Sequence, residues 1–145
     1  MRWFKKEEMA QCFRENGARC KECPLKQRAG KLPDGIEDNL KALVEEVLNP
    51  ARERLGRPIV VNDGYRCPLH NASVGGAPNS QHIHGEAADI RSSTGSVTTL
   101  GKIIEQLGNF DQLIYYPTFI HVSYKRLGRN RHQVLKKVPS GYQKV

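Results

Sequence analysis

The chain has 145 residues, of which 38% are hydrophobic, and its formal net charge at pH 7 is +8. This length fits one compact domain over residues 1–145. No apolar stretch approaches the roughly 20 residues that a membrane-spanning helix needs. A basic surface attracts polyanions of every kind, so the charge alone does not distinguish nucleic acid from an anionic cell wall.

The N-terminal segment gives few structural signals. Residues 1–8 are charged without an apolar run behind them, which is not the pattern of a signal peptide. We therefore expect synthesis in the cytoplasm, so that action at a cell wall would require release by another route, such as phage lysis. Residues 6–16 predict a short helix and residues 17–35 a loop, which makes residues 1–35 a variable segment. We expect a monomer.

The chain contains four cysteines, Cys12, Cys20, Cys23 and Cys67. In a cytoplasmic protein, reduced thiols are the default. The spacing of Cys20 and Cys23 is also that of one half of a structural zinc site or of a disulfide pair. The other half would then have to come from Cys12 and Cys67, at irregular spacing. The role of the cysteines stays open at this point.

A long helix is predicted after the N-terminal segment, with Asp34 as a possible N-terminal cap. Apolar residues recur at helical spacing between residues 36 and 55. Pro50 interrupts this pattern and is expected to kink the helix. Gly56 and Pro58 are expected to end it.

The second half of the chain predicts short strands around one further helix. Residues 64–85 are rich in Gly, Asn, Ser and Pro, and so long a connection in a small domain is usually functional. We expect an α+β fold with helices packed on one side of a small, largely antiparallel sheet. The predicted elements are strands at 59–61, 86–91, 111–116 and 119–124, a helix at 96–107 closed by Gly108, and a further strand candidate at 131–138.

A candidate zinc site emerges from the alternation of side chains in two predicted strands. Asp89 and His121 each project to the face opposite their apolar neighbours. His82 can reach the same point from the preceding loop, and His84 is a second candidate there. Imidazole nitrogen and carboxylate oxygen are zinc ligands, and a catalytic site leaves one position open. A lone strand histidine or a buried aspartate is, however, often purely structural.

The region from Pro58 to Tyr124 resembles the zinc D-Ala-D-Ala carboxypeptidases, including the vancomycin-resistance enzymes, and the phage L-Ala-D-Glu endopeptidases. That family carries the motif Ser-x-His-x-x-Gly-x-Ala-x-Asp and a later strand histidine. The matching residues are Ser80, His82, Gly85, Ala87, Asp89 and His121, preceded by Gly64-Tyr65-Arg66, Asn71 and Val74-Gly75-Gly76. The resemblance implies the fold shared with the Hedgehog signalling domain and a zinc ion bound by His82, Asp89 and His121.

The same resemblance implies roles for further residues. Arg66 matches an arginine that binds the substrate carboxylate or the polarised carbonyl, for which a planar guanidinium is suited. Ser80 is expected to support the site by hydrogen bonding and to contact substrate, as is Tyr116. The family also places an acidic general base shortly before the last histidine, but residues 115–120 contain no carboxylate. The candidate substitutes are Glu86, Asp111, Asp63 and His84.

These observations together predict a zinc metallopeptidase that cuts a peptide bond in the stem peptide of peptidoglycan, in wall remodelling or phage lysis. The sequence does not choose between D-Ala-D-Ala and L-Ala-D-Glu bonds. The alternative is a non-catalytic member that keeps zinc for stability and binds wall or a protein. A nucleic-acid binder, suggested by the basic run at residues 125–131, is the weakest hypothesis, since such runs are usually solvated surface.

Overall fold

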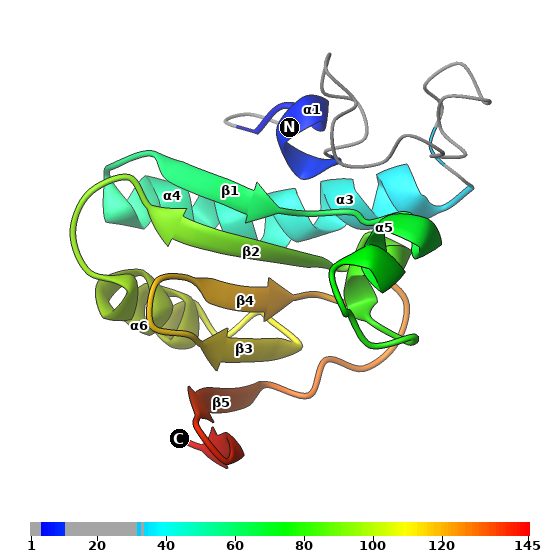
Figure 1. Cartoon of the computed structure of the whole chain (residues 1–145). Helices are drawn as coiled ribbons and strands as arrows, with labels where there is room; N and C mark the ends of the chain where they lie inside the picture. The colour runs from blue at the N-terminus through cyan, green and yellow to red at the C-terminus, as the bar shows by residue number, and fades with distance from the viewer. Residues whose placement is uncertain (1–3, 11–31, 33) are drawn as a thin grey trace.

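The computed structural model describes residues 4–10, 32 and 34–145 (Figure 1). Within these residues, six strands form one sheet in the order β1-β2-β4-β3-β5-β6. The strands are β1 (Ile59–Asp63), β2 (Ala87–Ser92), β3 (Gln112–Tyr115), β4 (Ile120–Ser123), β5 (Gln133–Val138) and β6 (Gly141–Lys144). Neighbouring strands are antiparallel except β3 and β5, which run parallel. The predicted, largely antiparallel sheet is confirmed.

The main helices cover one face of this sheet. Figure 1 shows α3, α4 and α6 behind the strands, and their apolar side chains pack with those of the strands in one core. The helical segments are α1 (Lys6–Met9), α3 (Ile36–Leu43), the π-helical turn η2 (Val44–Leu48), α4 (Asn49–Leu55), α5 (Pro68–Ser73), the 3-10 turn η3 (Gln81–His84) and α6 (Val97–Leu107). The predicted α+β arrangement is therefore confirmed.

The long helix begins differently from the prediction. Its N-terminal cap is Gly35, in the left-handed region at φ 81°, and no side chain caps the helix there. The prediction that Asp34 caps it is wrong, because the left-handed turn at Gly35 intervenes. Acidic Glu37 and Asp38 instead lie in the first turn, where they interact favourably with the helix dipole.

Pro50 is accommodated without ending the helix. The preceding turn, η2, is π-helical, and wider turns of this kind absorb a local mismatch in the hydrogen-bond ladder. Proline has no N–H, so Glu46 loses its usual partner four residues on. The Asn109 side chain donates to that carbonyl oxygen at 3.5 Å and to the Glu46 carboxylate at 2.9 Å. The predicted kink thus takes the form of a π turn within a continuous helical segment.

The long connection at residues 64–85 is more ordered than predicted, because it contains α5 and η3. Pro68 occupies the start of α5, and the Cys67 sulfur accepts a hydrogen bond from the N–H of His70. Ser80 caps η3 by accepting a hydrogen bond from the N–H of His82. Helices of one or two turns lack a readable apolar period, which explains why the sequence analysis described only a loop.

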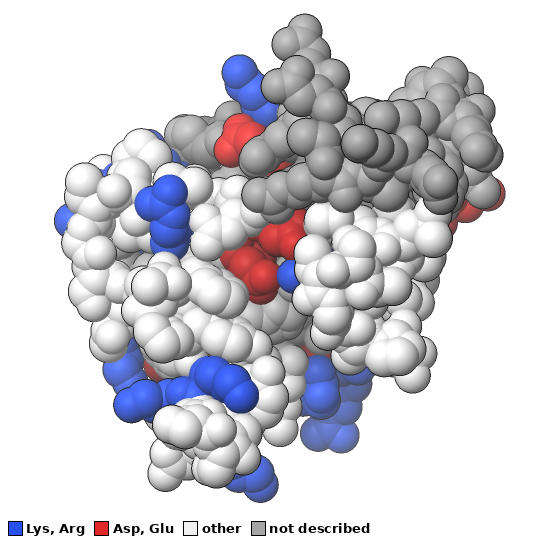
Figure 2. Space-filling model, in the orientation of Figure 1, with Lys and Arg blue, Asp and Glu red and all other residues white. Residues whose placement is uncertain are grey.

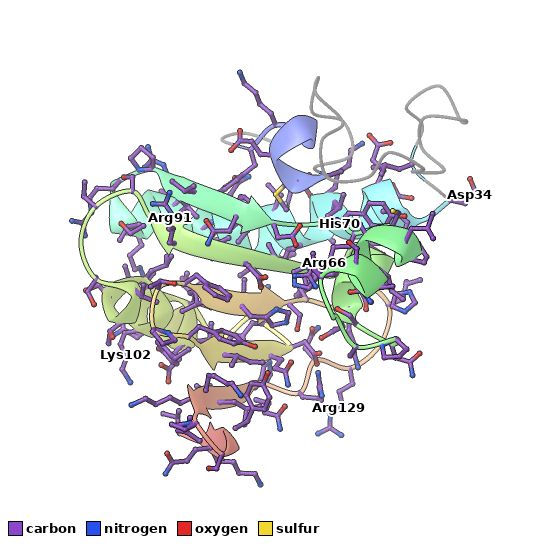
Figure 3. All side chains as sticks on the ribbon, viewed as in Figure 1. Asp34, Arg66, His70, Arg91, Lys102 and Arg129 are labelled. Atoms are coloured by element: carbon purple, nitrogen blue, oxygen red, sulfur yellow. The ribbon has the colours of Figure 1, made fainter. Side chains whose placement is uncertain are left out.

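The C-terminal residues add two strands. The candidate at 131–138 is confirmed as β5, whereas β6 was not predicted. Part of the basic run that leads into β5 is used internally, since Arg126 donates to the Asn39 side chain at 3.0 Å and Arg131 pairs with Asp111 at 2.8 Å. Arg129 points away from the fold (Figure 3).

The described residues 4–10 of the N-terminal segment pack against the end of β1. Ala10 forms a parallel bridge with Tyr65, whose N–H donates to the carbonyl of Met9 at 2.7 Å. The predicted helix at 6–16 is seen as α1, while residues 11–16 and most of the loop predicted at 17–35 lie outside the described residues. Of the helices that the structure describes, none has the length and apolar character to span a membrane.

Candidate metal centre and its pocket

Two of the predicted zinc ligands meet because of the register between β2 and β4. Asp89 on β2 lies directly opposite His121 on β4. Their chain neighbours Ile90 and Val122 are fully buried in the core. Because side chains alternate along a strand, the pattern that buries Ile90 and Val122 turns Asp89 and His121 to the other face, which α3, α4 and α6 leave uncovered.

His82 reaches the same point from η3. The side chain is 3% exposed, and Nδ1 lies 2.7 Å from the carbonyl oxygen of Gly64. That oxygen can only accept, so Nδ1 carries the proton and the lone pair of Nε2 faces Asp89. The chain at Gly64 passes so close to α1 that a Cβ there would lie 2.1 Å from the Met9 carbonyl oxygen. Glycine at this position therefore helps to orient the histidine.

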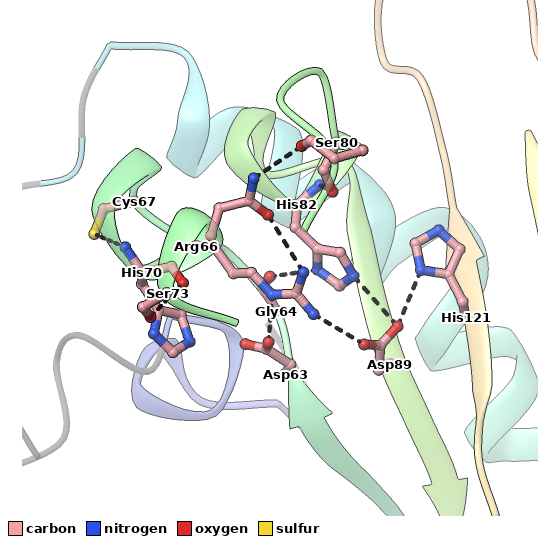
Figure 4. A network of polar contacts seen from close by, with 12 residues as sticks. Asp63, Gly64, Arg66, Cys67, His70, Ser73, Ser80, His82, Asp89 and His121 are labelled. Atoms are coloured by element: carbon pink, nitrogen blue, oxygen red, sulfur yellow. Dashed lines mark hydrogen bonds and ion pairs between the residues drawn. The ribbon is translucent and has the colours of Figure 1, made fainter. Parts of the chain in front are cut away.

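The three side chains converge on one carboxylate oxygen (Figure 4). Asp89 Oδ1 lies 3.0 Å from His121 Nδ1 and 3.3 Å from His82 Nε2. One ligand atom from each residue lies within 4.8 Å of the others, and tetrahedral zinc ligands stand about 3.3 Å apart. Two imidazole nitrogens and one carboxylate oxygen are a set that zinc takes, so the residues present fit a zinc ion.

The electrostatics of this group also suit a cation. Burial by itself would raise the pKa of Asp89, but the adjacent side chains of His121 and His82 outweigh this effect and hold the pKa well below its usual range. Burial lowers the pKa of His121, and the hydrogen bond to Asp89 offsets only part of that effect. An anionic carboxylate and a neutral imidazole are the forms in which these groups bind a metal.

Arg66 is fixed beside these ligands. Its Nε donates to Asp63 Oδ2 at 2.5 Å and its Nη2 lies 3.4 Å from Asp89 Oδ2. The Asn71 side chain accepts from Nη1 at 3.4 Å, and the backbone N–H of Arg66 donates to the carbonyl of His82 at 3.0 Å. Figure 4 shows the guanidinium between Asp63 and the ligand group. Its position next to the metal candidates agrees with the substrate-binding role expected from the sequence.

The ligand group opens into a pocket of about 490 Å³. Figure 2 shows acidic atoms deep in a depression on this face and basic side chains along the lower part of the molecule. The described residues that line this pocket are Arg66, Gly75, Gly76, Ala77, Asn79, Ser80, Gln81, His82, Asp89, Gln112, Ile114, Tyr116, Phe119, His121, Arg131 and Tyr142. A larger cavity of about 750 Å³ lies by the start of α6. The smaller pocket is the functional candidate, since it holds the convergent ligands.

The four candidates for the general base lie elsewhere. Among the described residues that line the pocket, the one carboxylate is that of Asp89. Glu86 precedes β2 and is half-buried, and His84 is exposed at the end of η3. Asp63 is occupied by Arg66. None of these side chains is placed to act directly within the pocket.

Asp111, the fourth candidate, is not among the described residues that line the pocket. It is fully buried, and its carboxylate accepts from Arg131 Nη2 at 2.8 Å, from the Arg131 N–H at 2.7 Å and from Gln81 Nε2 at 3.1 Å. Burial by itself would raise the pKa of Asp111. The hydrogen bonds from Arg131 and its charge together outweigh this effect, so the pKa of Asp111 lies below its usual value. Gln81 and Arg131 both line the pocket, so Asp111 positions two wall residues.

Ser80 and Tyr116 both line the pocket. The hydroxyl of Ser80 accepts from the N–H of His82 at 3.2 Å, so it helps to place that histidine. Tyr116 stacks on Phe119 with ring centroids 4.5 Å apart, and its hydroxyl lies 3.0 Å from that of Tyr142. Burial raises the pKa of Tyr116, and the hydrogen bond with Tyr142 and the charge of Asp89 raise it further. The phenol therefore stays protonated.

The lining residues that the sequence analysis did not single out include three polar side chains from β3 and the C-terminal part of the chain: Gln112, Arg131 and Tyr142. Arg131 and Tyr142 follow the motif region in the sequence, and Tyr142 lies on the unpredicted strand β6. Gln112 alternates with apolar residues of β3 like any surface side chain. No local signal marks these residues, because the parallel pairing of β5 with β3 brings them to the pocket.

Comparisons with known proteins agree with this geometry. Residues 3–123 match the family described as Peptidase M15. A stretch of 44 residues, 30% of this chain, is 48% identical to the zinc D-Ala-D-Ala carboxypeptidase of Streptomyces albus G. The stretch covers 17% of that relative, so the likeness concerns a small part of its length.

Proposed function

We propose that this chain, which belongs to the peptidase M15 family, is a zinc-dependent peptidase that cuts a peptide bond in the stem peptides of peptidoglycan. The observation that carries the proposal is the convergence of His82, Asp89 and His121 at the bottom of a pocket beside Arg66. The name of the Streptomyces relative supports both the metal and the substrate class.

His82, Asp89 and His121 would hold the zinc ion beside the pocket. When bound, zinc supplies Lewis acidity at this point, acting on a carbonyl oxygen and on a water molecule. The hydrogen bond between His82 and Gly64 fixes the imidazole, and such partners of a ligand typically matter about 10- to 100-fold for metal affinity or activity. The side chains of His82, Asp89 and His121 are largely buried, and their low exposure to solvent strengthens each charge interaction.

Two guanidinium groups give the pocket its selectivity for anions. Arg66 is held by Asp63 and Asn71, and Arg131 by Asp111. Stem peptides carry carboxylates close to the bonds that such enzymes cut. We propose that Arg66 binds the carboxylate or the carbonyl next to the scissile bond, while the more exposed Arg131 binds a second acidic group. Pre-oriented charged donors stabilise developing negative charge without further reorganisation.

Residues 115–120 contain no carboxylate. The polar side chain that this stretch contributes to the pocket is that of Tyr116. Its hydroxyl, kept protonated and linked to Tyr142, can donate a hydrogen bond to substrate but cannot serve as a base near neutral pH. Proton transfer by a dedicated side chain contributes typically 10²–10⁴-fold. We therefore expect slower turnover than in relatives with an acidic residue at this point.

One alternative function has a specific observation in its favour. Apart from Asp89, no carboxylate lies among the described lining residues. A non-catalytic protein that keeps zinc for stability and binds the cell wall would have the same lining.

An activity assay distinguishes the two functions: the zinc-loaded chain is incubated with muropeptides, and free D-Ala and new amines are followed by mass spectrometry. Released D-Ala indicates carboxypeptidase activity, and splitting after L-Ala indicates endopeptidase activity.

The controls separate catalysis from binding. His121→Ala should abolish product formation, and His84→Ala, an exposed histidine outside the pocket, should leave it unchanged. Absence of any product after long incubation, with zinc bound and wall binding intact, would overturn the enzymatic proposal in favour of the binding one. Delivery to the wall by phage lysis stays a separate proposal.

A further inference from the structure

A second cavity lies next to the pocket that contains the metal ligands (the metal pocket), at the start of α6. Its volume is about 750 Å³, and the charged side chains that line it are those of Lys102, Lys136 and Lys137. We call it the lysine cavity. Lys102 projects from α6 (Figure 3), and no aspartate or glutamate is among the described residues that line the cavity. Positive charge therefore gathers in a concave surface that the proposed catalysis does not use.

Two of these lysines have no acidic partner in the described part of the chain. Lys136 and Lys137 take part in none of the ion pairs between described residues. The charge of Lys102 is partly balanced, since its Nζ lies 3.4 Å from Glu105 Oε2, which also accepts a hydrogen bond from the Tyr115 hydroxyl. Ammonium groups without a counter-charge attract anions. The lysine cavity is thus suited to an anionic ligand.

The lysine cavity and the metal pocket share a wall. Tyr116, directly after β3, lines both of them. Lys137 on β5 lies opposite Tyr142 on β6, and its Nζ is 4.8 Å from the centroid of the Tyr142 ring. Tyr142 lines the metal pocket, and its hydroxyl lies 3.0 Å from that of Tyr116. A ligand that extends from the metal pocket past these two tyrosines therefore meets Lys137 and the lysine cavity.

The substrate proposed for the metal pocket supplies such a ligand. Cross-linked peptidoglycan joins two stem peptides covalently, so that a second stem with its own carboxylates is tethered to the one at the metal. Tethering raises the effective concentration of the second stem to about the millimolar range. Lysine binds a carboxylate as a flexible point charge, whereas the planar fork of arginine fixes one orientation. Two lysines are therefore suited to a second stem that adopts several positions.

We propose that the lysine cavity is a second substrate subsite, which binds the carboxylates of the stem peptide that is cross-linked to the one at the metal. The inference rests on the proposed function, because it concerns the same substrate. It goes beyond that function in making the chain selective for cross-linked over uncross-linked peptidoglycan. Lys136 and Lys137 provide this selectivity, and Lys102 contributes less because Glu105 balances part of its charge.

Turnover of two muropeptides measures the selectivity. The zinc-loaded chain is given either a monomer with one stem peptide or a cross-linked dimer with two, and the rates are compared per cleavable bond. We expect kcat/KM to be about twofold to thirtyfold higher for the dimer, mainly through KM, because two exposed ion pairs contribute about that much. The ratio should fall as salt is added, since salt screens exposed charges. Equal kcat/KM values at low salt would overturn the proposal.

A pair of double variants assigns the selectivity to the lysine cavity. Lys136→Gln/Lys137→Gln removes both unbalanced charges, and the ratio of the two kcat/KM values should fall toward one while zinc content and thermal midpoint stay as in the parent. Lys5→Gln/Lys41→Gln, at two exposed lysines outside both cavities, is the matched control and should keep the parental ratio. An equal fall in both variants would show that net charge causes the preference and would overturn the proposal.

A binding measurement separates the subsite from catalysis. If the zinc-loaded chain forms no product, binding of labelled monomer and dimer to the same chain is measured by fluorescence anisotropy. Tighter binding of the dimer, lost in Lys136→Gln/Lys137→Gln, would support the subsite although the proposed function fails. Turnover without preference for the dimer would overturn the subsite and leave the proposed function standing. Neither turnover nor preferential binding would overturn both.

A phosphate-bearing wall polymer is the other anion that the same experiment examines. Polyglycerol phosphate is added to the parent protein and to Lys136→Gln/Lys137→Gln. We expect it to bind the parent more weakly than the cross-linked dimer does, since it lacks the stem peptide that the metal pocket holds. Lysine-dependent binding of this polymer that is tighter than that of the dimer would overturn the proposal and assign the lysine cavity to a phosphate polymer.

Discussion

Asp89 and Asp111 are two buried aspartates with lowered pKa values, yet they differ in chemistry. The partners of Asp89 are two histidines and, at 3.4 Å, Arg66 Nη2, and the group opens into a pocket. The partners of Asp111 are the donors of Arg131 and Gln81, with the Ser123 hydroxyl at 3.5 Å. Imidazole nitrogens can give a lone pair to a metal, whereas guanidinium and amide nitrogens only donate protons. Burial and charge alone therefore do not identify a functional carboxylate.

The first prediction tests the metal group and has the largest expected effect. His82→Ala or His121→Ala should remove zinc from the pocket and abolish turnover, because two remaining ligands do not hold the metal in tetrahedral geometry. Thermal stability should fall as well, since the folded state loses metal-binding free energy. Elemental analysis and calorimetry measure both effects. Undiminished zinc in either variant would show that the ligand assignment is wrong.

The second prediction concerns Arg66, which links the ligand group to the substrate. Arg66→Lys should lower kcat/KM by about tenfold to a hundredfold, because lysine lacks the planar fork and a hydrogen bond to a charged group is worth about 1.5–3 kcal/mol. Zinc content should stay unchanged. Arg91→Lys, on the exposed side of β2, is the control and should behave as the parent protein. Normal kinetics of Arg66→Lys would refute the role.

The third prediction tests the structural aspartate. Asp111→Asn should lower the free energy of unfolding by about 1–3 kcal/mol at pH 7, because it weakens charge-assisted hydrogen bonds to the partly exposed Arg131. The folded pKa of Asp111 is lowered. Its contribution is therefore complete above the unfolded value of about 3.9 and is lost as the pH falls through the folded value.

Denaturant unfolding at several pH values checks this expectation. The difference between the parent protein and Asp111→Asn should shrink below about pH 4, while zinc stays bound at pH 7. Asp38→Asn, an exposed acid on α3, should be nearly neutral. If Asp111→Asn lost zinc at pH 7, Asp111 would affect the metal site as Asp89 does. If the variant and the parent protein were equally stable, Asp111 would not stabilise the fold.

The fourth prediction has the smallest effect. Tyr116→Phe should reduce kcat by about two- to tenfold, since one neutral hydrogen bond contributes about 0.5–1.5 kcal/mol. Tyr142→Phe should have a weaker effect of the same kind, because it removes only the partner that orients Tyr116. Steady-state kinetics on both variants measures this. A larger loss in Tyr142→Phe than in Tyr116→Phe would mean that Tyr142 contacts substrate itself.

Much of the metal centre was predictable from local patterns. Alternation in β2 and β4 fixes which face Asp89 and His121 occupy, because the period of a strand is two and the apolar neighbours must be buried. The motif from Ser80 to Asp89 then indicated His82 as the third ligand. The helix predicted at residues 96–107 matches α6 within one residue at each end, and the long helix predicted at residues 36–55 is observed as the continuous run of α3, η2 and α4.

Other features depended on contacts between distant segments. The sequence of residues 111–124 does not show that Asp111 is saturated by Arg131, so it remained a candidate base. Likewise, Tyr142 and Arg131 carry no local mark of function. They reach the pocket because β5 pairs with β3 in parallel, a choice that depends on how the whole sheet is assembled.

The sequence by itself therefore determined the ligand types, the faces on which they lie and the strand pattern that holds them, since these follow from nearest-neighbour geometry and burial. The tertiary structure decided which carboxylate remains available to a metal and which residues line the pocket. These depend on hydrogen bonds and packing between segments far apart in the chain, and no local pattern encodes such contacts.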